Sequence, residues 1–111
     1  MSADVKITDN TQKTSEEFKR ALLRGMWSVG ETAERYAKLD CPVDTGRLRN
    51  SITHEEDENE QAVYIGTNVE YAPFIELGTS RMRARPFLQP AATQHGDEYK
   101  RILESSLKAG D

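Results

Sequence analysis

The chain has 111 residues and a net charge of -4, and its single cysteine, Cys41, has no partner for an intrachain disulfide. This length predicts one ordinary domain, residues 1–111, without a disulfide scaffold. The chain has no apolar run long enough to span a membrane and no secretory signal at its start, so we expect a soluble protein made in the cytoplasm. The acidic balance argues against the basic stripe of a typical nucleic-acid-binding protein.

Residues 1–13 are polar and carry few apolar anchors. Val5 and Ile7 alternate within them, which predicts an N-terminal arm or a short strand. A small sheet in this chain would take its third strand from this segment or from residues near Met82.

A long helix is predicted over 14–40, with Thr14 and Glu17 forming a capping box at its start. Its apolar residues recur at helical spacing and are Phe18, Leu22, Gly25, Met26, Val29, Ala33, Tyr36 and Ala37. Leu23 and Trp27 lie one turn apart but outside this stripe. They are expected either to be covered by a loop of the same chain or to form a subunit contact.

A rigid turn follows the helix. Pro42 ends the helix, Asp44 and Thr45 are expected to accept hydrogen bonds from backbone amides, and Gly46 is suited to a positive φ. The Asp-Thr-Gly triplet also resembles the catalytic motif of retroviral-type aspartic proteases. Those proteases are all-β and hold the aspartate in a buried strand-to-turn setting, whereas here the triplet follows a helix. A small aspartic protease is therefore the third-ranked function.

Residues 41–89 are predicted to form a hairpin and then an extended loop. Alternate residues that share a face of each strand are Leu48, Asn50, Ile52 and His54, then Val63, Ile65 and Thr67. An acidic run joins the two strands, with Glu55, Glu56, Asp57, Glu58 and Glu60 in six positions. The simplest interpretation of this run is a solvated hairpin tip.

The segment 71–92 is apolar and aromatic but broken by four structure-breaking residues, three of them prolines. Such a segment predicts an ordered, extended loop that buries its side chains against another protein. The interface candidates within it are Tyr71, Pro73, Phe74, Glu76 and Phe87.

Arg81, Arg83 and Arg85 alternate within the same loop, which would set three guanidinium groups along one edge. They are suited to pair with carboxylates of a neighbouring subunit or to grip phosphate. The segment lacks interleaved aromatic residues that could stack on bases, which makes nucleic-acid binding the weaker choice. A nucleic-acid-binding accessory protein is therefore the alternative function.

A second helix is predicted over 90–109, from Pro90 to a stop at Gly110. Gly96 disfavours helix, so the first turns of this helix are expected to be distinct from the rest. The complete pattern predicts an α+β fold, in which the two helices pack on a small antiparallel sheet built around a long hairpin.

No pattern in the chain predicts a catalytic centre. His54 and His95 have no partner at metal-ligand spacing, and the sequence has no phosphate-binding loop, dinucleotide fingerprint or nucleophile elbow. We therefore expect no catalytic residue, no cofactor and no metal.

Three blocks carry a family resemblance: CPVDTGRLRNSI at 41–52, VEYAPFIELGT at 69–79 and RPFLQPA at 85–91. In this order, and with a helix before and after them, they resemble the neck and minor tail component family of long-tailed bacteriophages and prophages. The resemblance covers most of the chain from about residue 14 onward.

The resemblance implies a non-enzymatic virion assembly protein at the head-tail junction, as a neck or tail-completion component. It implies a ring around the DNA path, with a hexamer favoured, and contacts with other connector, terminator or tail-tube proteins. It implies no small-molecule substrate and no membrane, with DNA only as passing cargo, and a place in the virion after assembly in the host cytoplasm. The acidic run would then line the channel and repel the DNA backbone, remain a solvated tip, or dock on a connector subunit.

Overall fold

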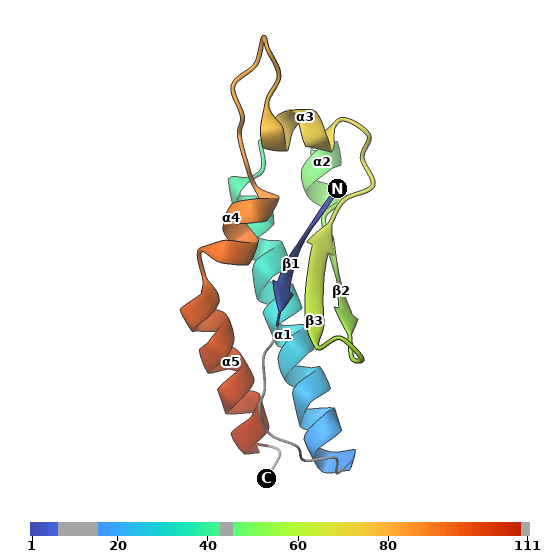
Figure 1. Cartoon of the computed structure of the whole chain (residues 1–111), viewed down its shortest axis with the longest axis vertical. Coiled ribbons are helices and arrows are strands. Elements are labelled where there is room, and N and C mark those ends of the chain that lie inside the picture. Colours follow the sequence, from blue (N-terminus) through green and yellow to red (C-terminus); the bar gives the residue numbers. More distant parts are fainter. Residues whose placement is uncertain (7–15, 43–45, 110–111) are drawn as a thin grey trace.

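The computed structural model describes residues 1–6, 16–42 and 46–109. Its elements in chain order are β1 (Ser2–Lys6), α1 (Glu16–Asp40), α2 (Arg47–Asn50), β2 (Thr53–Asp57), β3 (Ala62–Gly66), α3 (Ala72–Leu77), α4 (Leu88–Thr93) and α5 (Gly96–Ala109). The fold is α+β, as predicted, and the molecule is elongated, with extents of 52 × 22 × 21 Å (Figure 1). The predictions made for Ile7, Thr14, Asp44, Thr45 and Gly110 lie outside the described residues.

Helix α1 forms because its apolar residues recur on one face while its ends carry suitable charges. Glu16 and Glu17 lie in the first turn and Lys38 in the last, where each favours the helix dipole. Six residues of the predicted stripe are buried: Leu22, Gly25, Met26, Val29, Ala33 and Ala37. The other two, Phe18 and Tyr36, pack half-buried at the edge of the core.

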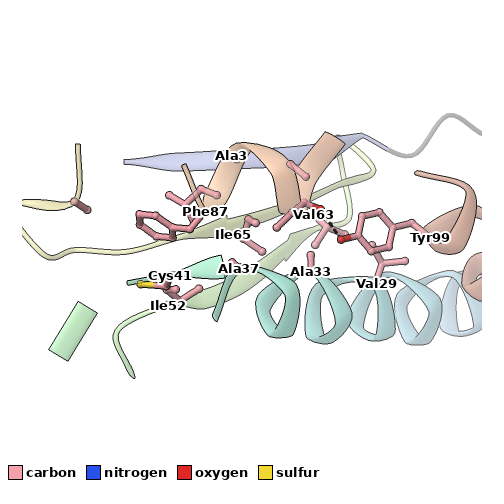
Figure 2. Packing of buried hydrophobic residues seen from close by; sticks show 14 of the residues in the cluster. Ala3, Val29, Ala33, Ala37, Cys41, Ile52, Val63, Ile65, Phe87 and Tyr99 are labelled. Carbon is pink, nitrogen blue, oxygen red and sulfur yellow. Dashed lines mark hydrogen bonds between the residues drawn. The ribbon is translucent and has the colours of Figure 1, made fainter. Parts of the chain in front are cut away.

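The sheet has the order β1-β3-β2 and is antiparallel throughout, so the third strand comes from the N-terminus. Ala3 and His54 both pair with Ile65, and side chains at these positions share the face of the sheet that α1 and α4 cover. Figure 2 shows Val63 and Ile65 pointing from β3 toward α1. Strands β1 and β2 are the two edges of the sheet.

The strand predicted from Leu48 onward begins later than expected. Leu48 and Asn50 lie in the single helical turn α2, and β2 starts only at Thr53. The turn closes through the Asn50 N–H, which donates to the Gly46 carbonyl at 2.9 Å. Helical geometry lets Leu48 enter the core, and this packing outweighs the alternation read from the sequence.

The predicted C-terminal helix is divided into two. Helix α4 begins at Leu88, two residues before the predicted start, and α5 begins at Gly96, which separates the first turn as expected. Helix α5 packs on α1, where the Ser106 hydroxyl donates to the Ala21 carbonyl at 2.7 Å. The buried Tyr99 hydroxyl donates to the Ala91 carbonyl, which ties α5 to α4 (Figure 2).

Candidate protein-interaction site

The loop over residues 78–86, here called the arm, projects beyond α3 at one end of the molecule (Figure 1). Within the arm the chain turns back on itself, and its two sides are joined by backbone hydrogen bonds. The Thr79 N–H donates to the Met82 carbonyl at 2.8 Å, and the Met82 N–H donates back at 3.3 Å. The returning chain is held to α3 by the Arg85 N–H, which donates to the Ile75 carbonyl at 2.8 Å.

Gly78 allows the two sides of the arm to approach each other. Its φ of 78° and ψ of 175° place it in a region that is accessible almost only to glycine. A Cβ at this position would lie 2.7 Å from the Ala84 nitrogen and 2.9 Å from the Met82 carbonyl oxygen. The arm therefore depends on a glycine where it leaves α3.

Glu76 clamps the base of the arm from inside the chain. Its carboxylate accepts hydrogen bonds from the N–H groups of Phe87, Leu88 and Gln89, at 3.0, 2.9 and 3.1 Å. These N–H groups form the N-terminus of α4, where helix geometry leaves donors without intrahelical partners. Because α3 ends as the arm begins and α4 begins as it ends, this one side chain joins both ends of the arm.

The structure corrects the prediction for two interface candidates. Glu76 is 4% exposed and Phe87 is fully buried, so both stabilise their own chain and are not presented to a partner. Phe87 instead fills the core near α4 (Figure 2). An acidic residue within an apolar run that precedes a helix start was the available signal for the role of Glu76.

The other aromatic candidates remain at the surface to different degrees. Phe74 is 56% exposed, whereas Tyr71 and Pro73 are half-buried. Two further exposed apolar residues, which were not among the predicted interface candidates, are Leu77 at 70% and Met82 at 37%. Phe74 and Leu77 lie one turn apart on α3, and the name apolar surface is used here for these two residues with Met82 of the arm.

Arg81, Arg83 and Arg85 are all exposed on the arm. In the part of the chain that the structure describes, none of the three lies within ion-pair distance of a carboxylate. By contrast, Arg47 forms an ion pair with Glu70 at 3.0 Å and lies 5.5 Å from the centre of the Tyr71 ring. The arm thus carries three positive charges that its own described residues do not neutralise.

The acidic run divides into residues that stabilise the hairpin and residues that face solvent. Asp57 Oδ1 accepts from the N–H groups of Asn59 and Glu60, at 3.0 and 3.2 Å, which stabilises the turn. The Glu60 carboxylate accepts from the Tyr64 hydroxyl at 2.9 Å, a bond that raises the Tyr64 pKa. Glu55, Glu58 and Glu60 are exposed, and no lysine or arginine among the described residues pairs with them.

His54 joins β2 to α1 through two glutamates. Its Nε2 lies 2.9 Å from Glu31, and its Nδ1 lies 2.7 Å from Oε1 of Glu56 without the alignment of a hydrogen bond. Burial alone lowers the His54 pKa, but the hydrogen bond to Glu31 and the charge of Glu56 outweigh it and raise the pKa. Gly30 leaves room for the His54 ring, since a Cβ at this position would collide with Nδ1.

Trp27 lies against His54, with their ring centres 6.0 Å apart in an edge-to-face arrangement. It remains 55% exposed, so no segment of the described chain covers it, whereas Leu23 is half-buried. Trp27 therefore forms an exposed aromatic surface beside the edge strand β2.

The predicted turn is only partly visible. Pro42 and Gly46 are described, and Gly46 has a φ of 80° and caps α2, while Asp44 and Thr45 lie outside the described residues. Among the described residues no cluster of His, Cys, Asp or Glu is suited to hold a metal ion. Within the same residues, no helix is both long enough and apolar enough to cross a membrane.

Comparison with known proteins identifies one related family. The family HK97-gp10-like, described as "Bacteriophage HK97-gp10, putative tail-component", matches residues 6–78. The matched residues include α1, the sheet hairpin and α3, and they end where the arm begins. No curated protein and no solved structure matches the chain.

Proposed function

Since the chain belongs to the HK97-gp10-like family of bacteriophage tail components, we propose that it completes the junction between the head and the tail of a phage particle. Membership confirms the family resemblance, with the first two sequence blocks inside the matched range and the third, at 85–91, beyond it, and it makes the protein a structural component of the tail. A position in the neck or at the head-proximal end of the tail is the finer proposal.

The observation that carries this proposal is the arm with its adjoining apolar surface. Phe74, Leu77 and Met82 are exposed beside three arginines that no carboxylate of the described residues pairs with, and Glu76 ties α3 to the start of α4 through buried hydrogen bonds. A projecting, pre-ordered segment with apolar and charged side chains is suited to a protein partner, because little conformational entropy is lost when it binds.

The copies are proposed to form a ring around the path of the DNA, with six copies favoured. A closed ring requires two different surfaces that complement each other on adjacent copies. The arm and the Trp27 region lie on different elements and differ in shape and charge, which supports a head-to-tail arrangement. The outer surfaces of such a ring would contact connector, terminator or tail-tube proteins.

The test uses particles produced with the gene deleted and then complemented. We expect the deletion to yield separate heads and tails by electron microscopy, and the wild-type chain to appear in purified joined particles by immunoblot. Leu77→Ser should lower the yield of joined particles. Leu39→Ser is the matched control, because Leu39 is also a strongly exposed leucine, at 73%, but belongs to α1 and not to α3 or the arm.

Joined, infectious particles that lack the chain would contradict the proposal. If Leu77→Ser and Leu39→Ser gave equal particle yields, both at wild-type protein level, the apolar surface would not be part of the assembly contact.

A further inference from the structure

We propose that the arm of one copy docks on the acidic edge of a second copy, where the acidic edge is Glu55, Glu58 and Glu60 of β2 and the turn that follows it. This inference rests on the proposed ring and names the contact that builds it. It assigns the acidic run to a subunit interface instead of the wall of a DNA channel.

Each surface carries charge that the described residues of its own chain leave uncompensated. The arm presents three exposed arginines, and the acidic edge presents three exposed carboxylates, without ion pairs in the described parts of the chain. The structure does form such pairs elsewhere, as between Arg47 and Glu70. Arginine and carboxylate groups pair in a planar, two-point geometry, so the two surfaces match in chemistry as well as in sign.

The arm does not reach the acidic edge of its own chain. It projects from the end of the molecule beyond α3, whereas β2 runs from Thr53 away from that end and turns at Glu58 (Figure 1). The molecule is 52 Å long and its arm is held to α3 by backbone hydrogen bonds. A contact between the two surfaces therefore joins two copies.

The charges also select head-to-tail contact over a symmetric one. Strand β2 is an edge of the sheet, and an edge strand is open to pairing with another strand. Its carboxylates would repel the same edge of a second copy, and two arms would repel each other likewise. Only the unlike pairing is favourable, and unlike surfaces are those that close a ring.

An apolar contact accompanies the charged one. Trp27 is exposed beside His54, on the side of β2 that faces α1, and Met82 lies between two of the arginines on the arm. An exposed tryptophan and an exposed methionine supply the buried centre that a charged rim requires. The charged pairs orient the arm, and the apolar pair is covered when it docks.

The test measures association of the purified protein by sedimentation velocity at about 0.05 M and about 0.5 M NaCl. We expect wild-type protein to associate at low salt and to dissociate toward monomer at high salt. An arm variant, Arg83→Glu with Arg85→Glu, and an edge variant, Glu55→Arg with Glu58→Arg, should each be monomeric at low salt. Circular dichroism verifies that both variants are folded.

An equimolar mixture of the two variants provides the decisive measurement. In the mixture an acidic arm meets a basic edge and a basic arm meets an acidic edge, so association should return to the wild-type level. The matched control is Arg101→Glu with Lys108→Glu, two exposed residues of α5, which changes the net charge as the arm variant does and should associate like wild type.

Wild-type protein that stays monomeric at low salt, or a mixture that does not associate, would overturn the contact. A filter-binding assay covers the other outcome. If the wild type did not associate but retained duplex DNA on a filter, and the arm variant did not retain it, the arm would bind nucleic acid and the proposed contact would be wrong. None of these results bears on the place of the chain in the particle, which the immunoblot of purified particles decides.

Discussion

Removing the buried carboxylate at the base of the arm should destabilise the fold strongly. In Glu76→Ala, the N–H groups of Phe87 and Leu88 lose their acceptor, and both bonds are buried. A buried donor without a partner costs about 1–3 kcal/mol, so the two together should lower the free energy of unfolding by about 2–6 kcal/mol. The third donor, on Gln89, is only partly buried, so water can replace the carboxylate there.

Glu76→Gln separates the loss of hydrogen-bond acceptors from the loss of side-chain volume, because glutamine has nearly the same size as glutamate. The amide keeps one oxygen, which can serve Phe87 and Leu88, but its NH2 group then faces the Gln89 N–H. We expect a loss of about 1–2 kcal/mol for this variant. Since domains of this size are stable by about 5–15 kcal/mol, we expect both variants to be measurably less stable than wild type, with Glu76→Ala the less stable of the two.

The assay is urea unfolding followed by circular dichroism, with Glu70→Gln as the control. Glu70 is a largely exposed glutamate that pairs with Arg47, and losing such a pair costs less than about 1 kcal/mol. The reasoning would be refuted if Glu76→Ala unfolded within about 1 kcal/mol of wild type, or no more easily than Glu70→Gln. The clamp would then not hold the arm.

Three further predictions test the core, the arm and the helix-sheet contact. Phe87→Ala should lower the free energy of unfolding by about 3–5 kcal/mol in urea, whereas Phe74→Ala should unfold like wild type and reduce only the yield of joined particles; equal unfolding would contradict this division. Gly78→Ala should be destabilised by about 1–3 kcal/mol in thermal unfolding, because its φ is positive and its Cβ would meet the returning chain. Gly96→Ala, with open space around its Cβ, is the control and should be neutral or stabilising. For His54 the folded pKa is raised, so its contribution is fully present below the unfolded pKa near 6.5 and is lost as pH rises through the folded value. The stability difference between wild type and His54→Gln should therefore be larger at about pH 5.5 than at about pH 8.5, and a difference that did not fall with pH would refute the protonated contact.

Local sequence determined the elements whose signals lie within a few residues. Helix α1 follows from apolar residues at helical spacing with charges at its ends, and the hairpin from two alternating strands around an acidic turn. The break at Gly96 could also be predicted, because glycine weakens the interior of a helix and is tolerated at its ends. These patterns are consequences of the helix and strand periods, so they need no knowledge of what the element packs against.

Tertiary structure alone decided the assignments that depend on distant partners. Leu48 alternates like a strand residue but becomes helical because a helical turn takes it into the core. Phe74 and Phe87 look alike in sequence, yet one lies at the surface and the other is fully buried, since only the packing of α3 and α4 distinguishes them. Glu76 serves donors 11 to 13 residues away, a distance over which a carboxylate leaves no periodic signal. Residue spacing determines local conformation, but burial is decided only when segments far apart in the chain come together.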